Sequence, residues 1–350
     1  MTPAIPARLS VYVGHGNATG DIEIFGFDRE SAALSPRAVV ASGSSTSFFA
    51  LHPTRRFAYT THNRSERVTA FAFDGATGLL HALGDAVVPP RGTEPEVGPA
   101  YLAVDASGQY LVVANYRGHN TVVFRLHADG TIGPLVSNVT SGTHAHCVAI
   151  APGNRHVFVP TLGADVIAQY TLDAATGALS PNQPATVATA PGAGPRHMVF
   201  APSGQQAFVV NELDATLSSF AYDSDRGVLT PLTTVATLPS DYDGRRWAGD
   251  IQIHPNGRWL YVSNRAHDSL AVFEVADHGR VLALVTRTPC GGKTPRNFTL
   301  DPAGEHLFCA NQDSANVVIF AIDARTGHLA QRADHAVAPA PYFVRVIDLG

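Results

Sequence analysis

Short apolar segments recur along the whole chain, separated by turns that contain glycine or proline. Apolar runs bounded by such turns are typical of buried β-strands. No segment repeats its apolar residues with the 3.6-residue period of a helix, so the pattern excludes a helical repeat protein. The recurring first segments are residues 48–53, 101–105, 146–150, 197–200, 250–255 and 297–302.

Each first segment begins a unit that contains further apolar segments. An aromatic-rich segment such as residues 57–59 or 260–262 follows it, and a third such as residues 68–73 comes after a short loop. Equivalent positions lie roughly 46 to 53 residues apart, and this period with four short strands per unit predicts the blades of a β-propeller. Turns of the type Asp-x-x-x-Gly-x-Leu follow at residues 74–79, 173–179, 223–229 and 323–329.

The two ends of the chain complement each other. Six complete units fill residues 47–335, whereas residues 11–13 and 22–25 look like second and third strands without a first strand. Residues 342–348 look like a first strand with nothing after it. Together they complete a seventh blade and remove the exposed sheet edges of an open ring. The sequence therefore predicts an all-β fold: a single seven-bladed β-propeller domain over residues 1–350, closed by its C-terminal strand.

Composition and charge narrow the possible partners. The chain has 350 residues, 45% of them hydrophobic, and a net charge of −5 without a basic stripe that could neutralise phosphates, so we expect no nucleic-acid partner. No apolar run reaches membrane-spanning length, and residues 1–10 lack the pattern of a signal peptide. The three cysteines, Cys147, Cys290 and Cys309, are too few for a disulfide framework. These features predict a cytoplasmic protein with no membrane partner.

A hairpin over residues 195–212 suggests where the chemistry lies. Arg196 stands where its first strand begins, and Glu212 stands just past the end of its second strand. These two places are adjacent in an antiparallel hairpin, so both side chains should reach one rim of the fold. In a propeller, the corresponding positions of all blades meet at one mouth of the central channel. Glu212 is then either a catalytic group or the structural partner of an arginine.

Three arginines recur at strand beginnings about one blade apart: Arg196, Arg246 and Arg296. A guanidinium presents a planar fork that suits a carboxylate or a phosphate, so the set predicts a small anionic substrate. The alternative is a ring of structural ion pairs with Asp250 and its neighbours. Asn211 precedes Glu212, and an asparagine there is also explained by turn chemistry.

Histidines raise the question of a metal. His144 and His146 share one strand face by their spacing, but no second pair of histidines or cysteines has ligand spacing, so we expect neither metal nor cofactor. His146 is a candidate for proton transfer, with a hydrogen-bonded channel histidine as the alternative. Cys147 should face the core, which argues against a nucleophilic role.

Three stretches carry a resemblance to a known family. Residues 192–200, 210–213 and 246–251, together with Thr294-Pro295-Arg296, resemble the 6-phosphogluconolactonases of the seven-bladed propeller lactonase family. The chain is also similar to the related fungal carboxy-cis,cis-muconate cyclases. The resemblance implies that His146, Arg196 and Glu212 are catalytic. It further implies that one or more of Arg246 and Arg296 belong to the site. We expect all of Asn211, Arg246, Asp250 and Arg296 to bind the substrate.

The implied reaction is the metal-independent hydrolysis of a sugar δ-lactone, above all 6-phosphogluconolactone. Water would attack the lactone carbonyl, either Glu212 or His146 would take its proton, and an arginine would stabilise the oxyanion. Two alternatives stay within the same fold: a lactonase for an unphosphorylated sugar acid and a lactonising cycloisomerase. A third, of another class, is a propeller that only holds partner proteins.

Overall fold

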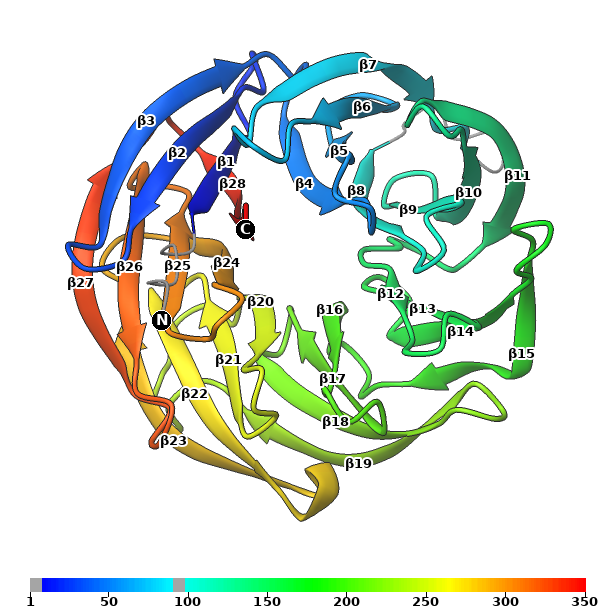
Figure 1. Ribbon diagram of the computed structural model, residues 1–350. Coiled ribbons are helices and arrows are strands. Elements are labelled where there is room, and N and C mark those ends of the chain that lie inside the picture. The colour runs from blue at the N-terminus through cyan, green and yellow to red at the C-terminus, as the bar shows by residue number, and fades with distance from the viewer. Residues whose placement is uncertain (1–7, 91–97) are drawn as a thin grey trace, which may run out of the picture.

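Seven four-stranded antiparallel sheets form a closed ring in the computed structural model, which describes residues 8–90 and 98–350 (Figure 1). We number the blades in chain order, so that blade 1 is β4–β7 and blade 7 is built by β28 with β1–β3. The described residues contain no α-helix and one 3-10 turn, η1 (Asp277–Gly279). The predicted seven-bladed β-propeller is thereby confirmed.

The innermost strands of blades 1 to 7 are β4 (Thr46–Leu51), β8 (Pro99–Val104), β12 (Ala149–Ile150), β16 (Pro195–Phe200), β20 (Ala248–Ile253), β24 (Pro295–Leu300) and β28 (Pro341–Asp348). The second strands are β5 (Phe57–His62), β9 (Tyr110–Asn115), β13 (His156–Thr161), β17 (Gln206–Asn211), β21 (Trp259–Asn264), β25 (His306–Asn311) and β1 (Leu9–His15).

The third strands are β6 (Arg67–Phe73), β10 (Asn120–Leu126), β14 (Val166–Leu172), β18 (Thr216–Asp223), β22 (Ser269–Ala276), β26 (Asn316–Ile322) and β2 (Ile22–Asp28). The outermost are β7 (Leu80–Val87), β11 (Ile132–Thr140), β15 (Leu179–Ala188), β19 (Val228–Ala236), β23 (Val281–Pro289), β27 (Leu329–Ala336) and β3 (Ala33–Val40).

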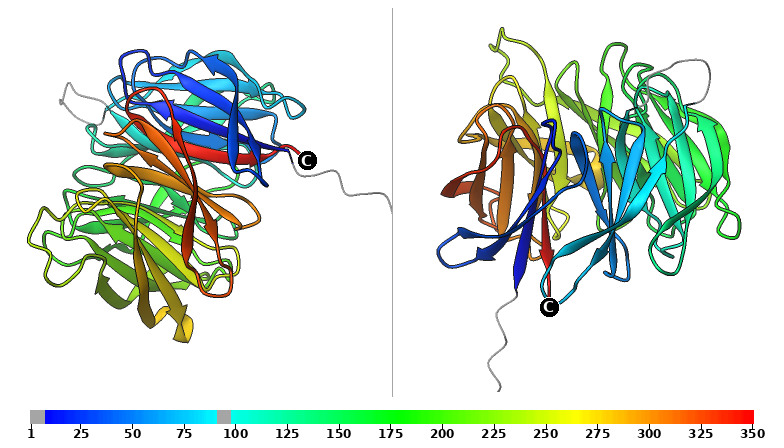
Figure 2. Two further views of the ribbon diagram at one scale, coloured as in Figure 1. Left: turned by 90° about the vertical axis from the view of Figure 1, so that its left-hand side faces the viewer. Right: turned by 90° about the horizontal axis from the view of Figure 1, so that it is seen from above.

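Blade 7 closes the ring as predicted. Strand β28 pairs antiparallel with β1, from Leu9 opposite Asp348 to Gly14 opposite Phe343. The two ends of the chain therefore share one sheet, and the C-terminus lies at one face of the ring (Figure 2). Every innermost strand pairs with the second strand of its own blade, and its other edge faces the channel.

The core lies between neighbouring sheets. Second strands such as β9 and β21 are buried along their whole length because a blade packs on each of their faces, and the outermost strands are largely exposed. Buried tyrosines tie blades together: the Tyr12 hydroxyl donates to the Gly78 carbonyl at 2.6 Å, and Tyr59 donates to Gly130 at 3.0 Å. Gly78 belongs to one of the Asp-x-x-x-Gly turns and has a φ of +76°, which favours glycine.

Within the described ranges, no helix has the length and hydropathy needed to cross a membrane.

Candidate active site

One extra residue interrupts the pairing of the innermost and second strands in each blade. In blade 4, Pro195 pairs with Asn211 but the next pair is His197 with Val210, so Arg196 is a β-bulge. Bulges redirect a side chain out of the regular alternation and are common beside active sites. The seven extra residues, which we call the bulge ring, are Ser47, Ala100, His146, Arg196, Gly249, Arg296 and Tyr342.

A second set of residues, the rim ring, directly follows the second strand of each blade. The backbone N–H of Glu212 donates to Gly194 at 2.7 Å, and that of Arg265 donates to Trp247 at 2.7 Å, so each is fixed against the residue that precedes the innermost strand. Members of both rings line a cavity of about 210 Å³ at the mouth of the channel. The rim ring consists of Gly16, Asn63, Tyr116, Leu162, Glu212, Arg265 and Gln312.

Glu212 is held between two arginines. Its Oε2 lies 2.9 Å from Nε of Arg196 and 2.6 Å from Nη2 of Arg265, and Trp247 Nε1 donates to Oε1 at 2.9 Å. Burial raises the pKa of Glu212, but the charges of Arg265 and Arg196 and the Trp247 hydrogen bond outweigh it, so the pKa lies below its usual value. A carboxylate stabilised in this way is a poor proton acceptor.

His146 is the more available base. Its side chain lines the cavity, and its buried Nδ1 has no hydrogen-bond partner among the described residues. Burial first, and then the charge of Arg196, hold its pKa well below the ordinary value, so the imidazole is neutral at pH 7. A neutral imidazole can accept a proton without first losing one.

Arg196 is held by Gly249 and His197 as well as by Glu212 in the cavity wall. Its Nη1 donates to the Gly249 carbonyl at 2.7 Å and lies 3.3 and 3.1 Å from the two ring nitrogens of His197, over the face of the imidazole. Gly249 is the bulge-ring member of blade 5, and a Cβ there would come within 2.5 Å of Ser263 Oγ. A Cβ would also lie 2.9 Å from the Pro295 carbonyl oxygen, so the missing side chain lets the innermost strand of blade 6 approach closely.

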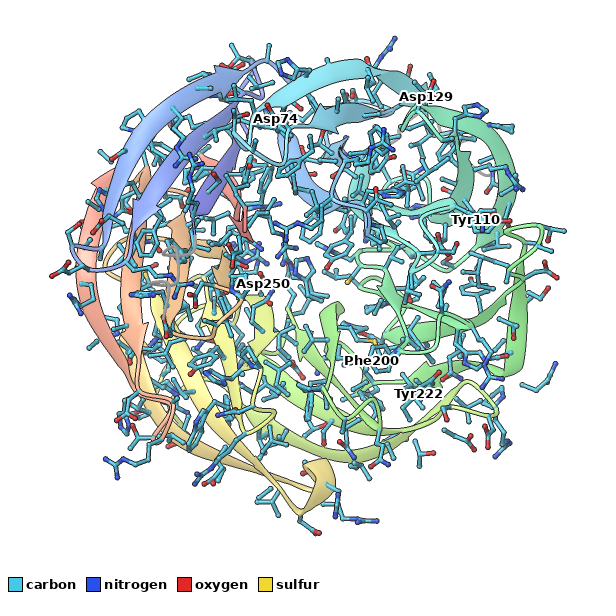
Figure 3. The ribbon with its side chains drawn as sticks, viewed as in Figure 1. Asp74, Tyr110, Asp129, Phe200, Tyr222 and Asp250 are labelled. Carbon is cyan, nitrogen blue, oxygen red and sulfur yellow. The ribbon has the colours of Figure 1, made fainter. Side chains whose placement is uncertain are left out.

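Asp250 lies beneath the cavity and does not line it, so the cavity wall lends no support to the predicted substrate contact. The carboxylate is 2% exposed and sits near the centre of the ring (Figure 3). Its Oδ1 lies 2.7 Å from His197 Nδ1, and its Oδ2 accepts from Nδ2 of Asn297. Burial chiefly lowers the pKa of His197, to about 4, so this ring is neutral and donates from Nδ1. Asp250 therefore orients His197 under Arg196.

Arg296 differs from the other two arginines. It is half-buried in the cavity wall, with Cζ 4.2 Å from the ring centroid of Tyr342 and Nη1 3.5 Å from Gln312 Oε1. Burial chiefly lowers its pKa, to about 10, so it remains a cation. Across residues 8–90 and 98–350, no carboxylate lies within ion-pair distance of it. Its charge is available to a ligand.

Two further residues that were expected to bind the substrate do not line the cavity. Arg246 is exposed, does not line the cavity, and donates weakly from Nη1 to the Asp214 carbonyl at 3.4 Å. It precedes β20 by two residues, and the true counterpart of Arg196 in that blade is Gly249, three residues later. Asn211 is 1% exposed and donates to the hydroxyls of Thr216 and Ser218, so it stabilises its own hairpin.

Sequence reasoning missed three residues of the site. Arg265 pairs with Glu212, Trp247 hydrogen-bonds to it, and Tyr116 lines the cavity 5.4 Å from the His146 ring. The signal for Arg265 was present, because Asn264-Arg265 occupies the same place in blade 5 as Asn211-Glu212 in blade 4. Trp247 carries no such repeat signal, because its indole reaches across from the next blade.

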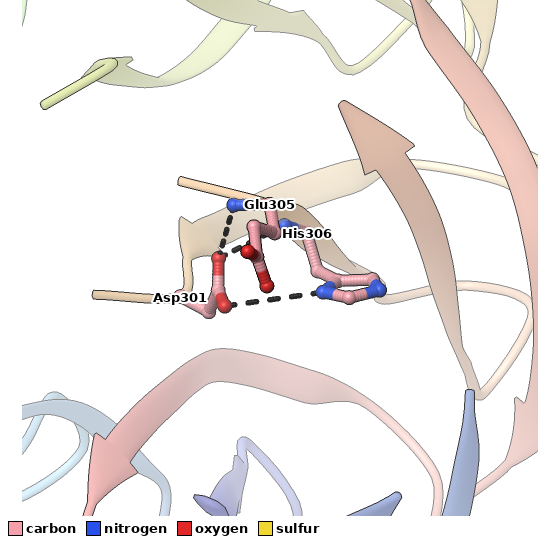
Figure 4. A group of neighbouring side chains, drawn as sticks. All are labelled: Asp301, Glu305 and His306. Carbon is pink, nitrogen blue, oxygen red and sulfur yellow. Dashed lines mark hydrogen bonds and ion pairs between the residues drawn. The ribbon is translucent and has the colours of Figure 1, made fainter. Parts of the chain in front are cut away.

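The histidines and carboxylates give little support for a metal centre. The His144 ring stacks on Tyr116 at 4.3 Å. Among the described residues, one group of three metal-type side chains lies close together: Asp301, Glu305 and His306, in the turn between β24 and β25 (Figure 4). Arg29 of blade 7 contacts both carboxylates there, at 3.3 Å from Asp301. The group is best explained as an ionic tie between blades 6 and 7.

Comparison with known proteins places this geometry in a family. Residues 10–346 match the model of the family described as "Lactonase, 7-bladed beta-propeller". A 6-phosphogluconolactonase of Pectobacterium carotovorum is 36% identical over 297 residues, which cover 85% of this chain and 86% of the relative.

Two solved structures are similar over nearly all of the chain. A Bacteroides fragilis protein described as a candidate 6-phosphogluconolactonase has a TM-score of 0.88 at 29% identity, covering 99% of this chain and all of that one. The periplasmic gluconolactonase PpgL of Pseudomonas aeruginosa has a TM-score of 0.89 at 27% identity, covering 98% and 100%.

Proposed function

The chain belongs to the seven-bladed β-propeller lactonases, and we propose that its cavity hydrolyses 6-phosphogluconolactone to 6-phosphogluconate without a metal. The enzyme class, a lactone hydrolase, follows from the family. The observation that carries the substrate is the arginine cluster: Arg117, Arg196, Arg265 and Arg296 line a cavity whose one described carboxylate is Glu212. This excess of positive charge favours an anionic substrate, such as a phosphate monoester, which carries about two negative charges at neutral pH.

Arg296 is the group that best fits the phosphate. Arg196 and Arg265 are already occupied by Glu212, whereas Arg296 has no acidic partner among the described side chains. Its guanidinium can form two parallel hydrogen bonds to phosphate oxygens. The neutral part of the wall, with Ser47, Asn63 and Tyr342, then faces the hydroxyl groups of the sugar ring.

His146 acts as the base in this mechanism. A water molecule attacks the lactone carbonyl carbon while Nε2 takes its proton, and the negative charge that develops on the carbonyl oxygen is stabilised by Arg196. The tetrahedral intermediate then expels the ring oxygen, which recovers the proton from His146, and the chain opens as the acid. A positioned general base contributes about 10²–10⁴-fold.

Glu212 has a different task from the one that its position alone suggested. Both of its oxygens are engaged by Arg196, Arg265 and Trp247, so neither is free to take a proton from the attacking water. It holds Arg196 and Arg265 side by side, in a geometry that two free cations would not keep. Substrate binding also favours His146 as the base, because a phosphate offsets the arginine charges that lower the His146 pKa.

The second candidate substrate is an unphosphorylated gluconolactone. It is favoured by one observation, the similarity to the Pseudomonas aeruginosa gluconolactonase. This substrate has no phosphate, so Arg296 would bind no anionic group of it. The chemistry at His146 would be the same for both lactones. We place the enzyme in the cytoplasm because its three cysteines are free, which fits a reducing compartment.

The test is a hydrolysis assay with the two lactones, each measured with and without EDTA. We expect kcat/KM for 6-phosphogluconolactone to exceed that for glucono-δ-lactone by at least about tenfold, because one more charge-assisted interaction is worth about that factor. We expect no effect of EDTA. Equal kcat/KM values for the two lactones would contradict recognition of the phosphate. Loss of activity with EDTA would contradict a metal-independent mechanism.

A further inference from the structure

A second cavity opens at the opposite end of the channel. It has a volume of about 650 Å³ and is lined by the later residues of the innermost strands β4, β8 and β28, with Arg55 in the turn after β4. The active-site cavity, in contrast, is lined by the beginnings of these strands. Phe48 borders both cavities and stacks on Tyr101 with ring centroids 3.6 Å apart, so this aromatic pair lies between them.

A single charged residue stands out in this part of the channel. The residue three positions beyond the bulge is small or uncharged in six blades, and it is arginine only in blade 7. The innermost strands also carry two carboxylates, Asp250 on β20 and Asp348 on β28; burial raises the pKa of Asp250, and His197 and then the charge of Arg345 lower it. A buried charge costs free energy unless it is paired, so a cation is not needed here for packing. In blade order these residues are Ala50, Ala103, Ala149, Val199, Gln252, Thr299 and Arg345.

Arg345 has weak partners within the protein. Its Nε donates to the Phe49 carbonyl at 3.4 Å, and its Cζ lies 4.6 Å from the Phe48 ring centroid. No carboxylate of residues 8–90 or 98–350 lies within ion-pair distance of it. Asp348 also lines the cavity, but its Oδ1 accepts from the Gly350 backbone at 3.0 Å.

The rest of the wall is apolar. It is formed by aromatic and branched side chains from β4, β8 and β28 and by Val148, which directly precedes β12, and Arg55 adds a second positive charge at the outer edge. A cavity of this size, with an apolar wall and few polar groups at one end, is typical of a site for a small molecule. The apolar members are Phe49, Leu51, Leu102, Val104, Val148, Val346 and Ile347.

The geometry points to a second binding site, for a small apolar carboxylate such as an aromatic monoacid. Its carboxylate would pair with Arg345, whose guanidinium is already held flat against Phe48, and its apolar body would lie along the Phe48–Tyr101 pair. A charged head with an apolar body matches this cavity, whereas the polar, arginine-rich active site suits a sugar phosphate. The two sites therefore select different classes of anion.

The probe for this site is 4-fluorobenzoate, followed by ¹⁹F NMR in a titration with the full-length protein. We expect a dissociation constant of about 1 mM or lower, which is modest for a ligand of this size. The uncharged analogue 4-fluorobenzamide should bind at least about tenfold more weakly, since it cannot form the ion pair. No detectable binding of the benzoate at 10-fold higher concentrations would overturn the proposal.

Variants decide which cavity holds the probe. Arg345→Gln should weaken benzoate binding at least about tenfold, whereas Arg56→Gln, an exposed arginine outside the cavity, should not change it. Arg296→Gln in the active site should leave it unchanged. The opposite result, in which Arg296→Gln abolishes binding and Arg345→Gln does not, places the benzoate in the active site and overturns the proposal.

A second substitution keeps the test independent of the stability of the Arg345 variant. Ala103→Leu enlarges a side chain in the cavity wall and leaves every charge in place. We expect it to weaken benzoate binding without changing the hydrolysis of 6-phosphogluconolactone. Unchanged benzoate binding in a folded Ala103→Leu protein would show that this cavity is not the site.

Discussion

The two halves of the active-site mouth are built on the same backbone, but their bulge-ring and rim-ring positions carry charged side chains in one half only. Outside these two rings, Arg117 of blade 2 also lines the cavity. Blades 3 to 6 place His146, Arg196 and Arg296 in the bulge ring, with Glu212 and Arg265 beside them. Blades 7, 1 and 2 place neutral residues at the equivalent positions. Those residues are Tyr342, Ser47 and Ala100 in the bulge ring and Gly16, Asn63 and Tyr116 in the rim ring.

This difference between the two halves shows how a symmetric fold can hold an asymmetric site. The bulge and the backbone hydrogen bond of the rim ring recur around the channel, so each blade offers two positions at the mouth. A catalytic site then needs reactive side chains at only one or two positions per blade, because these positions of all blades already meet at the mouth of the channel. We interpret the charged half as the part that performs the reaction and holds the phosphate, and the neutral half as the part that accommodates the sugar.

The largest effect should come from removing the base in the charged half. His146→Gln keeps a polar side chain but cannot take up a proton, so kcat for 6-phosphogluconolactone should fall by about 10²–10⁴-fold. Ser47→Ala, at the equivalent bulge position of the neutral half, should change kcat by less than about tenfold. The two variants are compared by steady-state kinetics. Equal losses of kcat in the two variants would contradict a division of the mouth into a catalytic half and a half that accommodates the sugar.

Loss of the central carboxylate should mainly affect stability. Glu212→Gln leaves Arg196 and Arg265 adjacent and unpaired, and breaking a buried ion pair in this way costs about 3–5 kcal/mol. The free energy of unfolding can be measured in urea. Gln312→Ala, at the same rim position of blade 6, should cost less than about 1 kcal/mol. A Glu212→Gln protein of unchanged stability that has lost activity would make Glu212 the base instead of His146.

The phosphate site should be visible as a change in KM. Arg296→Lys keeps the positive charge but loses the planar fork, so KM for 6-phosphogluconolactone should rise by about 10-fold with little change in kcat. Glucono-δ-lactone lacks the phosphate, and its KM should change much less. Arg246→Lys is the matched control, because this exposed arginine lies outside the cavity. An equal rise in KM for both lactones would show that Arg296 does not recognise the phosphate.

The fold could be predicted almost completely from the sequence. The repeated apolar segments predict where the strands lie, and the period of the repeat predicts how they are grouped into blades. Both depend on local patterns that recur seven times. The hairpin argument also brought Arg196 and Glu212 to one rim, where the structure has them 2.9 Å apart. That success came from pairing within one blade, which strand order determines.

The errors concern contacts between blades. The sequence placed Arg246 at the mouth because it lies about one repeat after Arg196, but an insertion shifts the true counterpart to Gly249. Arg265 and Asp250 contact residues of blade 4 from blade 5, and no periodicity within one repeat reports such pairs. The roles of these side chains depend on which neighbours the ring brings together, and only the three-dimensional arrangement supplies that information.

We also expect a pH dependence of stability that belongs to the layer beneath the charged half. Burial lowers the pKa of His197 from 6.5 to about 4, so the unfolded chain binds a proton between these values and the folded one does not. This contribution to the free energy of unfolding is fully present above pH 6.5 and is lost as the pH falls toward 4. Over that interval it amounts to roughly 3 kcal/mol.

Urea unfolding between pH 4.5 and 7 measures this slope for the parent protein and for His197→Gln. Other buried histidines, including His146 and His62, add slopes of the same sign, so only the difference between the two proteins counts. The variant should show a flatter profile by up to roughly 2–3 kcal/mol over this range. Ser47→Ala, in the neutral half, should keep the slope of the parent. Parallel profiles for the parent and His197→Gln would mean that His197 is not held neutral beneath Arg196.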